Sequence, residues 1–447
     1  MGGRGKGVDP QIKARLLASI AAGRLVILCG AGLSMAPPSR LPSARRVAEN
    51  CFDRYRLEVD PQCNPALRID LEALAEHFVG LNNLKSYFIP TLVPWGALVR
   101  EPNSGHAAVA DFLLTGAAAA GLSTNYDILI ERMAWDYGAD FEASLDGDEA
   151  TAKAVSHKPL LKFHGCANRD RLSTVWTRSQ LNDPVIADRI AKTRTWMAAN
   201  LRQKDLLVVG FWSDWDYLNE ILGGALQGVV PLSVTVVDLS PPADLEAKAP
   251  GLWAIANQQQ VVFAHVQESG ADVLDELRRS FSTNYLRSIL AAGQPSFEQS
   301  ESVQCDQAWL DVGDHDSETL YGWRRDAEGV SAAAPARLVR PGQGGALGYF
   351  HLLLRRAGAQ EHGGGYVLQG RHVRVINGAS EVLSEVRGRF IEAPAITTEQ
   401  VTFVAVGATD IGLPTNVMRP GREGDVVRPA PGGLWLDFQQ ARTELGI

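Results

Sequence analysis

RLVILCGAGLS, residues 24–34, joins a run of apolar residues to a glycine-containing turn. The apolar run Leu25–Cys29 predicts a buried strand, and Gly30, Gly32 and Ser34 follow it directly. Glycines at such a junction let backbone N–H groups approach a pyrophosphate, and the serine adds a hydroxyl donor. A tight turn that binds no ligand has the same pattern, so this stretch alone leaves both interpretations open.

Four further segments repeat the pattern of an apolar run that ends in polar residues or glycine. They are GLSTNYD (121–127), LLKFHG (160–165), DLLVVGF (205–211) and SVTVVDL (233–239). Between them lie stretches with apolar residues at three- and four-residue spacing, which is typical of covering helices. The alternation predicts a Rossmann-like α/β fold, with a parallel sheet and helices on both faces, over residues 11–295.

The chain after residue 295 has a different character. Its 447 residues favour two domains, and a closing helix over 272–293 places the boundary of the first near 295. Residues 296–335 are polar and acidic, which predicts a linker or irregular layer. Residues 336–447 contain short β-branched runs and one amphipathic segment at 349–358, which predicts a smaller β-rich domain for assembly or partner docking.

Net charge gives no general reason to expect nucleic-acid binding, because the formal charge is −8. A local basic group consists of Arg324, Arg325, Arg355 and Arg356. It fits either solvated surface positions or a phosphate-binding patch.

The cysteines and the hydropathy indicate a cytoplasmic protein. The five cysteines are scattered singly, without the CxxC pairs of a structural zinc site, so we expect no metal and a reducing compartment. No apolar run approaches the roughly 20 residues that cross a bilayer, and the first ten residues lack the apolar core of a signal peptide. We therefore expect no membrane association.

Asn125, Asp127 and His164 are the candidate catalytic residues. Asn125 and Asp127 follow a predicted strand, where they can hold a sugar, an amide or an attacking water. His164 ends another strand and can accept a proton from a ribose hydroxyl. The alternatives are that Asp127 caps the following helix and that His164 is structural, as we expect for His106 near a helix start.

Two later strand ends complete the candidate set. Gly210 and Ser213, with Trp212, Asp214 and Asp216 nearby, suit a phosphate or ribose contact, although the same residues can form a helix-capping loop. Asp238 ends the next strand and suits a pair of ribose hydroxyls.

Read in order, GAGLS, TNYD, KFHG, GFWSD and VVD resemble the sirtuin superfamily over residues 15–290. The resemblance implies that Asn125 and Asp127 hold the nicotinamide ribose or a water and that His164 is the base. It also implies an NAD-binding set in which the turn after the first strand cradles the phosphates and the later strand ends line the adenosine. This set consists of Gly30, Ala31, Gly32, Ser34, Thr124, Gly210, Ser213, Asp214 and Asp238.

Two departures from that family bear on the activity. Its protein deacetylases carry a zinc module of two CxxC pairs and a GIPDFR-like loop, whereas residues 35–46 read MAPPSRLPSARR and no such cysteine pairs exist. The chain is more similar to the bacterial defence-associated branch, whose members hydrolyse NAD when a partner senses phage or plasmid. This resemblance implies NAD as substrate, homo-oligomerisation and a co-encoded partner, either a HerA-type ATPase or, as second choice, a short Argonaute. An NAD-dependent deacylase and a non-catalytic sensor of NAD or an ADP-ribose derivative remain alternatives.

Overall fold

A computed structural model describes residues 7–154, 157–211, 230–330, 341–391, 401–408 and 433–447. The chain forms two compact units. The first comprises Met1–Trp135 and Phe141–Leu277, and the second comprises Asp136–Asp140 and Arg278–Ile447. The expected boundary near residue 295 falls inside one helix, α12 (Gly270–Glu301), which continues across the division between the units.

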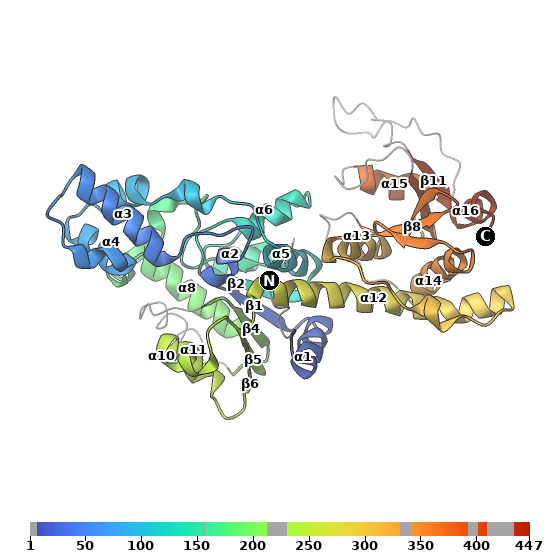
Figure 1. Ribbon diagram of the computed structural model, residues 1–447, viewed down its shortest axis with the longest axis horizontal. Helices are drawn as coiled ribbons and strands as arrows, with labels where there is room; N and C mark the ends of the chain where they lie inside the picture. Colours follow the sequence, from blue (N-terminus) through green and yellow to red (C-terminus); the bar gives the residue numbers. More distant parts are fainter. Residues whose placement is uncertain (1–6, 155–156, 212–229, 331–340, 392–400, 409–432) are drawn as a thin grey trace, which may run out of the picture. The chain divides into compact units, whose positions relative to one another are not determined.

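The first unit is built on a six-stranded parallel sheet of order β3-β2-β1-β4-β5-β6 (Figure 1). The strands are β1 (Leu25–Cys29), β2 (Ala118–Ser123), β3 (Leu160–Leu161), β4 (Asp205–Val209), β5 (Ser233–Val237) and β6 (Val262–Val266). Strand β1 lies between β2 and β4, so Cys29 is in register with Ser123 on one side and with Val209 on the other. The strand order reverses at this point, and open α/β sheets bind their ligands outside the carboxyl ends of such strands.

Helices cover both faces of this sheet, as the sequence predicts. On one face, α8 and α11 pack Ile190, Met197 and Leu252 against strand residues such as Val26 and Val208. On the other, Arg15 of α1 donates to Thr235. The described α-helices of the unit are α1 (Pro10–Ala21), α2 (Ala31–Met35), α3 (Ala44–Glu58), α4 (Leu71–Gly80), α5 (Ser104–Thr115), α6 (Leu129–Asp136), α7 (Gly147–Lys153), α8 (Pro184–Asn200), α10 (Leu245–Lys248), α11 (Pro250–Ala256) and the start of α12. The predicted Rossmann-like fold class is therefore confirmed.

A helical module is inserted between α2 and α5. Besides α3 and α4 it contains η1 (Pro65–Ile69), the π-helical η2 (Leu84–Leu92) and η3 (Trp95–Leu98). Its core is aromatic, with Phe52, Phe78 and Phe88 fully buried. Trp176, from the loop between η4 (Arg171–Ser173) and η5 (Arg178–Asn182), packs into the same cluster. The module is therefore joined to the strand-end loops by shared apolar packing.

The second unit contains a five-stranded mixed sheet of order β11-β10-β9-β8-β7. The strands are β7 (Gln360–His362), β8 (Gly365–Leu368), β9 (Arg371–Asn377), β10 (Val401–Val406) and β11 (Leu434–Asp437). They are accompanied by η7 (Gln307–Leu310), α13 (Ser317–Glu328), α14 (Pro341–Arg356), α15 (Leu383–Ile391) and α16 (Phe438–Leu445). The C-terminal sheet and the amphipathic helix expected at 349–358 are thus present, while the range expected to be irregular, 296–335, contains α13.

Arg324 and Arg325 are neither solvated surface residues nor part of a phosphate-binding patch, so both interpretations of these two arginines are wrong. Arg324 is fully buried and Arg325 is 2% exposed, and both guanidinium groups pair with the carboxylate of Glu328 on the same helix, α13. On the adjoining strand, Arg374 makes a two-pronged ion pair with Asp326, at 2.7 and 2.8 Å. These arginines can be buried because each pairs with a carboxylate, either one turn away on the same helix or on the neighbouring element. Sequence composition does not reveal such pairs.

The described residues contain no helix that is both long and apolar enough to cross a membrane. All five cysteines are described; each is buried and has a free thiol. In the described ranges, no three His, Cys, Asp or Glu side chains are grouped so that they could hold a metal ion.

Candidate active site

The turn after β1 and the turn after β4 touch through their glycines. The N–H of Gly30 donates to Val209 O at 2.9 Å, and the N–H of Gly32 donates to Gly210 O at 2.8 Å. A Cβ at Gly30 would lie 2.4 Å from the Cα of Phe211, and Gly210 has a φ of +57°, so only glycine fits this approach without strain. The N–H groups of Gly30 and Gly32 are therefore used inside the protein, whereas Ala31 and Ser34 reach the adjoining pocket.

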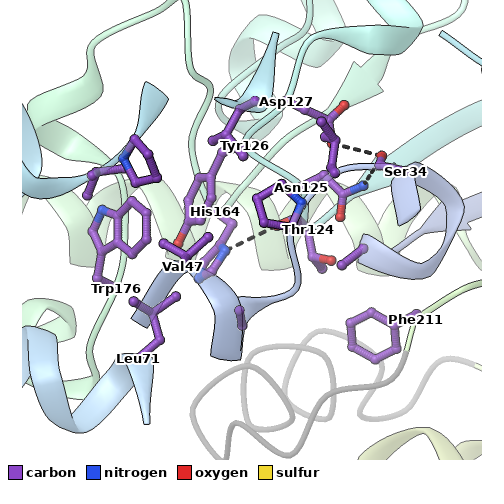
Figure 2. Close-up of a pocket in the computed structure, with 17 residues that line it drawn as sticks. Ser34, Val47, Leu71, Thr124, Asn125, Tyr126, Asp127, His164, Trp176 and Phe211 are labelled. Atoms are coloured by element: carbon purple, nitrogen blue, oxygen red, sulfur yellow. Dashed lines mark hydrogen bonds between the residues drawn. The ribbon is translucent and has the colours of Figure 1, made fainter. Parts of the chain in front are cut away.

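That pocket opens at the carboxyl ends of β1, β2 and β3 and holds about 930 Å³ of empty space, its open mouth included. Figure 2 shows its polar wall, which is formed by Ser34, Asn125, Asp127 and His164. The opposite wall is apolar and comes largely from the helical module and Trp176. Its residues are Leu41, Pro42, Ala44, Val47, Leu71, Val93, Pro94, Leu98 and Trp176. A concave site with one apolar wall and a few convergent polar groups is typical of a small-molecule site.

The Ser34 hydroxyl joins three polar side chains in the polar wall. It donates to Asp127 Oδ2 at 2.9 Å and accepts from Asn125 Nδ2 at 3.1 Å. His106 Nδ1 accepts the N–H of Asn103, so in the neutral ring Nε2 carries the hydrogen and donates to Ser34 Oγ at 3.1 Å. One donated and two accepted bonds use the full capacity of a hydroxyl. Ser34 therefore organises the wall, and its hydroxyl hydrogen is directed to Asp127.

Asn125 presents an acceptor to the pocket. Its amide nitrogen donates to Gly30 O and to Ser34 Oγ, both at 3.1 Å, so both N–H bonds have protein partners. The oxygen Oδ1 is what remains of the amide for a ligand. An amide held in this way can accept a hydrogen bond from a ribose hydroxyl or from a water.

The Asp127 carboxylate serves two structural partners at once. Oδ1 accepts the N–H of Leu129 at 3.2 Å, at the start of α6, while Oδ2 accepts from Ser34. The two sequence interpretations, a helix cap and a site residue, therefore both describe this side chain. Asp127 is 7% exposed and lines the pocket.

His164 lies against the stacked rings of Tyr126 and Trp176. Its ring centroid is 4.9 Å from that of Tyr126, which in turn stacks on Trp176 at 4.4 Å. Nδ1 lies 3.2 Å from the carbonyl of Thr124, which can only accept, so Nδ1 carries the hydrogen and Nε2 is the acceptor of the neutral ring. Burial lowers the pKa of His164 to about 3, and the charge of Arg189 acts in the same direction. The ring is therefore neutral across the physiological range.

The structure brings together most of the predicted site residues it describes. Ala31, Ser34 and Thr124 line the pocket with the three candidate catalytic residues. Gly30, Gly32, Gly210 and Asp238 are not among the lining residues, and the carboxylate of Asp238 accepts the N–H of Ser240 at 2.8 Å. The predicted contacts at Trp212, Ser213, Asp214 and Asp216 lie outside the described residues.

His106 is the main site residue that sequence reasoning missed. It was expected to be a structural residue near a helix start, and it does complete a capping box with Asn103 at the start of α5. Its other ring nitrogen, however, contacts Ser34 in the polar wall, and burial lowers the pKa of His106 to about 4. The Asn-x-x-His spacing signals the cap, but nothing local signals the second contact.

Comparison with known proteins identifies a related domain in the first unit. A family model described as a SIR2-like domain matches residues 120–229, about a quarter of the chain. A comparison with curated protein sequences gave no match.

Among solved structures, a Sir2 homologue in complex with NAD is 18% identical, with 63% of this chain and 96% of that chain covered and a TM-score of 0.32. A mutant Sir2 homologue in complex with 2′-O-acetyl ADP-ribose is 15% identical, with 61% and 96% covered and a TM-score of 0.33. The segment of this chain that is similar to the SIR2-like domain model carries Asn125, Asp127 and His164.

Proposed function

We propose that the protein is an NAD⁺ hydrolase that cleaves the bond between nicotinamide and ribose. The observation that carries the proposal is the convergence of Asn125, Asp127 and His164 on one pocket at the carboxyl edge of the parallel sheet. The SIR2-like match over the same residues supports NAD as the substrate. The pocket supplies an apolar wall for an aromatic ring and a polar wall for a sugar.

The charge of the pocket favours this reaction. Breaking the nicotinamide–ribose bond develops positive charge on the sugar, which a nearby carboxylate stabilises and a nearby cation opposes. Among the described lining residues none is Lys or Arg, and Asp127 is the acidic one. His164 is neutral because burial lowers its pKa. The described lining residues thus carry no positive charge, and the buried cation behind them, Lys162, is paired with the carboxylate of Glu131.

The polar wall also suits the attack of water. The water oxygen bonds to the ribose C1′, the electron pair of the broken C1′–N bond leaves with neutral nicotinamide, and one water proton is released. Asn125 Oδ1 orients the water or a ribose hydroxyl, and Nε2 of His164 accepts the proton. Asp127 stabilises the cationic sugar. Expelling a neutral leaving group needs little acid assistance, so the site requires no further proton donor.

The test measures nicotinamide and ADP-ribose release from NAD by the purified protein, alone and with the products of neighbouring genes. We expect His164→Ala and Asn125→Ala to lose on the order of 10²–10⁴-fold in turnover. His372→Ala, a substitution of a partly exposed histidine in the second unit, is the matched control and should keep full activity.

Retained turnover in both pocket variants would overturn the residue assignment. Bound but uncleaved NAD under every condition would favour a sensor of NAD or an ADP-ribose derivative. An acetylated peptide in the same assay tests the deacylase alternative through formation of the deacetylated product.

We further propose that this activity serves anti-phage or anti-plasmid defence by abortive infection, where NAD loss arrests the cell. An NAD hydrolase that stayed active would harm its own host, so the proposal requires a trigger. Activation by a co-encoded HerA-type ATPase is our first choice of partner, a short Argonaute the second, and we expect the SIR2-like domain to form homo-oligomers. Co-purification and partner-dependent nicotinamide release test these assignments.

A further inference from the structure

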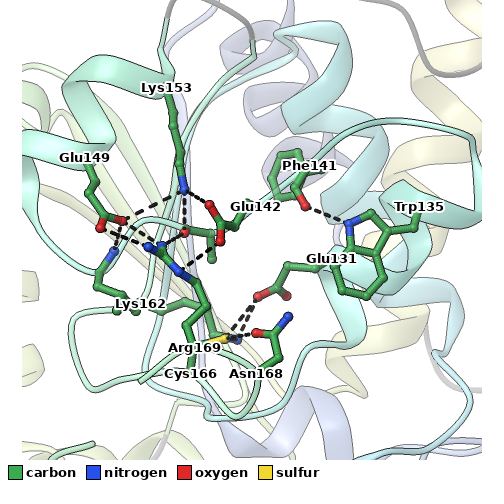
Figure 3. A network of polar contacts seen from close by, with 12 residues as sticks. Glu131, Trp135, Phe141, Glu142, Glu149, Lys153, Lys162, Cys166, Asn168 and Arg169 are labelled. Carbon is green, nitrogen blue, oxygen red and sulfur yellow. Dashed lines mark hydrogen bonds and ion pairs between the residues drawn. The ribbon is translucent and has the colours of Figure 1, made fainter. Parts of the chain in front are cut away.

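Lys162 is a buried cation directly behind the candidate active site. It lies between β3 and His164, its side chain is 1% exposed, and it does not line the pocket. Its ammonium group lies 2.9 Å from the carboxylate of Glu131, which is 2% exposed (Figure 3). A charged pair this deep in a protein is costly to desolvate, so stability alone is a weak reason for its presence.

The contacts of Lys162 join the segments that carry the candidate catalytic residues. Its Nζ donates to the main-chain carbonyl of Asp127, to Glu131 Oε1 on α6 and to Cys166 Sγ at 3.4 Å. These three partners account for the three N–H bonds of an ammonium group. They belong to the turn after β2, to α6 and to the turn after β3. One side chain therefore links the turn of Asn125 and Asp127 to the turn of His164.

The charge of Lys162 is secured by its surroundings. Burial alone would lower its pKa, but the carboxylates of Glu131 and Asp127 outweigh that effect and raise the pKa above its ordinary value. The group thus remains an ammonium with three donors. A backbone bond from the N–H of Ala167 to Tyr126 O, at 2.7 Å, connects the same two turns. His164 Nδ1 also bonds to Thr124 O, and Lys162 adds a link between these turns through an ionised side chain.

We propose that Lys162, with Glu131 as its counter-ion, is a positioning residue that holds Asn125 and His164 in one reactive geometry. The proposal rests on the NAD hydrolase function proposed above. It predicts that losing Lys162 slows the chemical step more than it weakens NAD binding, because misplacing reacting groups costs rate even where the binding surface survives.

The test uses the double variant Lys162→Met/Glu131→Leu, because replacing a buried ion pair by apolar residues of similar size is often neutral for stability. We expect kcat to fall on the order of 10²-fold with KM changed by less than about threefold. Lys162→Arg keeps the charge and the donors and should recover part of kcat. The matched control is Arg374→Met/Asp326→Leu, which removes a buried ion pair of the second unit and should leave kcat unchanged.

A folded double variant with wild-type kcat would overturn the proposal, and so would equal loss in the matched control. Hydrogen exchange provides a second readout that does not depend on turnover. Peptides covering 120–131 and 160–170 should exchange faster in the double variant than in the wild type. If the wild type releases no nicotinamide but these peptides lose protection, the proposed function fails while the link between the turns stands. Unchanged exchange would show that Lys162 does not hold the turns.

Discussion

Both units bury polar and charged side chains, but the buried groups at the strand ends of the first unit differ in their surroundings from the buried ion pair Asp326–Arg374 of the second. In the first unit, Ser34, Asp127 and His164 are each at most 7% exposed and line the pocket. In the second, Asp326 and Arg374 use their hydrogen-bonding capacity on each other. Burial of a charged side chain therefore does not by itself distinguish a ligand-binding site from a structural ion pair in the core. The cavity beside it does.

Two asparagines at strand ends show the same difference. Asn125 follows β2, and its amide nitrogen donates to Gly30 O and Ser34 Oγ. Its amide oxygen is therefore oriented to accept a hydrogen bond from a ligand. Asn377 ends β9, which is parallel to β10 and antiparallel to β8, but its oxygen accepts the N–H of Ala379 and caps a local turn. The residue type and its place on the strand are alike, so the neighbouring chain decides the role.

The largest expected effect is on the stability of the second unit. Arg374→Met leaves Asp326 buried without its cation, which we expect to lower the free energy of unfolding by about 3–5 kcal/mol. Urea denaturation measures the loss, and Arg374→Met/Asp326→Leu should recover most of it. A small loss in the single variant would mean that this ion pair is not buried as tightly as the charges of the first unit.

The next effect separates site from core within the first unit. Ser34→Ala removes one hydrogen bond each from Asn125 Nδ2, His106 Nε2 and Asp127 Oδ2. We therefore expect the free energy of unfolding to fall by about 1–3 kcal/mol and nicotinamide release to fall clearly. Ser19→Ala is the matched control, because Ser19 donates to the buried carboxylate of Asp205 at 2.7 Å away from the pocket. The control should lose stability but keep its turnover per folded molecule.

A smaller effect tests the role of His106. His106→Leu removes the donor to Ser34, and losing one hydrogen bond of about 1–1.5 kcal/mol should lower kcat roughly tenfold. His106→Gln can keep an N–H donor and should lose less. Equal kcat in the wild type and in folded His106→Leu would show that His106 serves only to cap α5 and does not support the reaction.

The smallest effect concerns pH. His106 and His164 have folded-state pKa values of about 4 and about 3, below the ordinary value of about 6.5, because they are buried. The unfolded chain then binds more protons below pH 6.5, so their contribution to stability is complete above that pH and is lost as pH falls toward the folded pKa values. Thermal unfolding at pH 7.5, 6 and 5 should show this decline, and His106→Gln should show less of it.

The sheet of the first unit was predictable because strand periodicity is local. The expected strand at 25–29 is observed, and the expected segments 205–211 and 233–239 contain β4 and β5. The edge strand β6 was not predicted, since its residues are mostly half-exposed and do not form the continuous buried run of the inner strands. The C-terminal sheet was predicted without most of its helices, because β-branched runs dominate that stretch of sequence.

The sequence by itself determined the parallel sheet, the strand-end turns and the identity of Asn125, Asp127 and His164 as candidates. Each of these follows from residues within a few positions of one another. Only the tertiary structure decided that Ser34 bonds to Asp127, 93 residues away, and to His106, 72 residues away. Hydrogen bonds tolerate only a few tenths of an ångström, and packing of the whole unit sets that placement. The sequence therefore identifies the candidate polar residues, and the tertiary structure determines which of them contact one another.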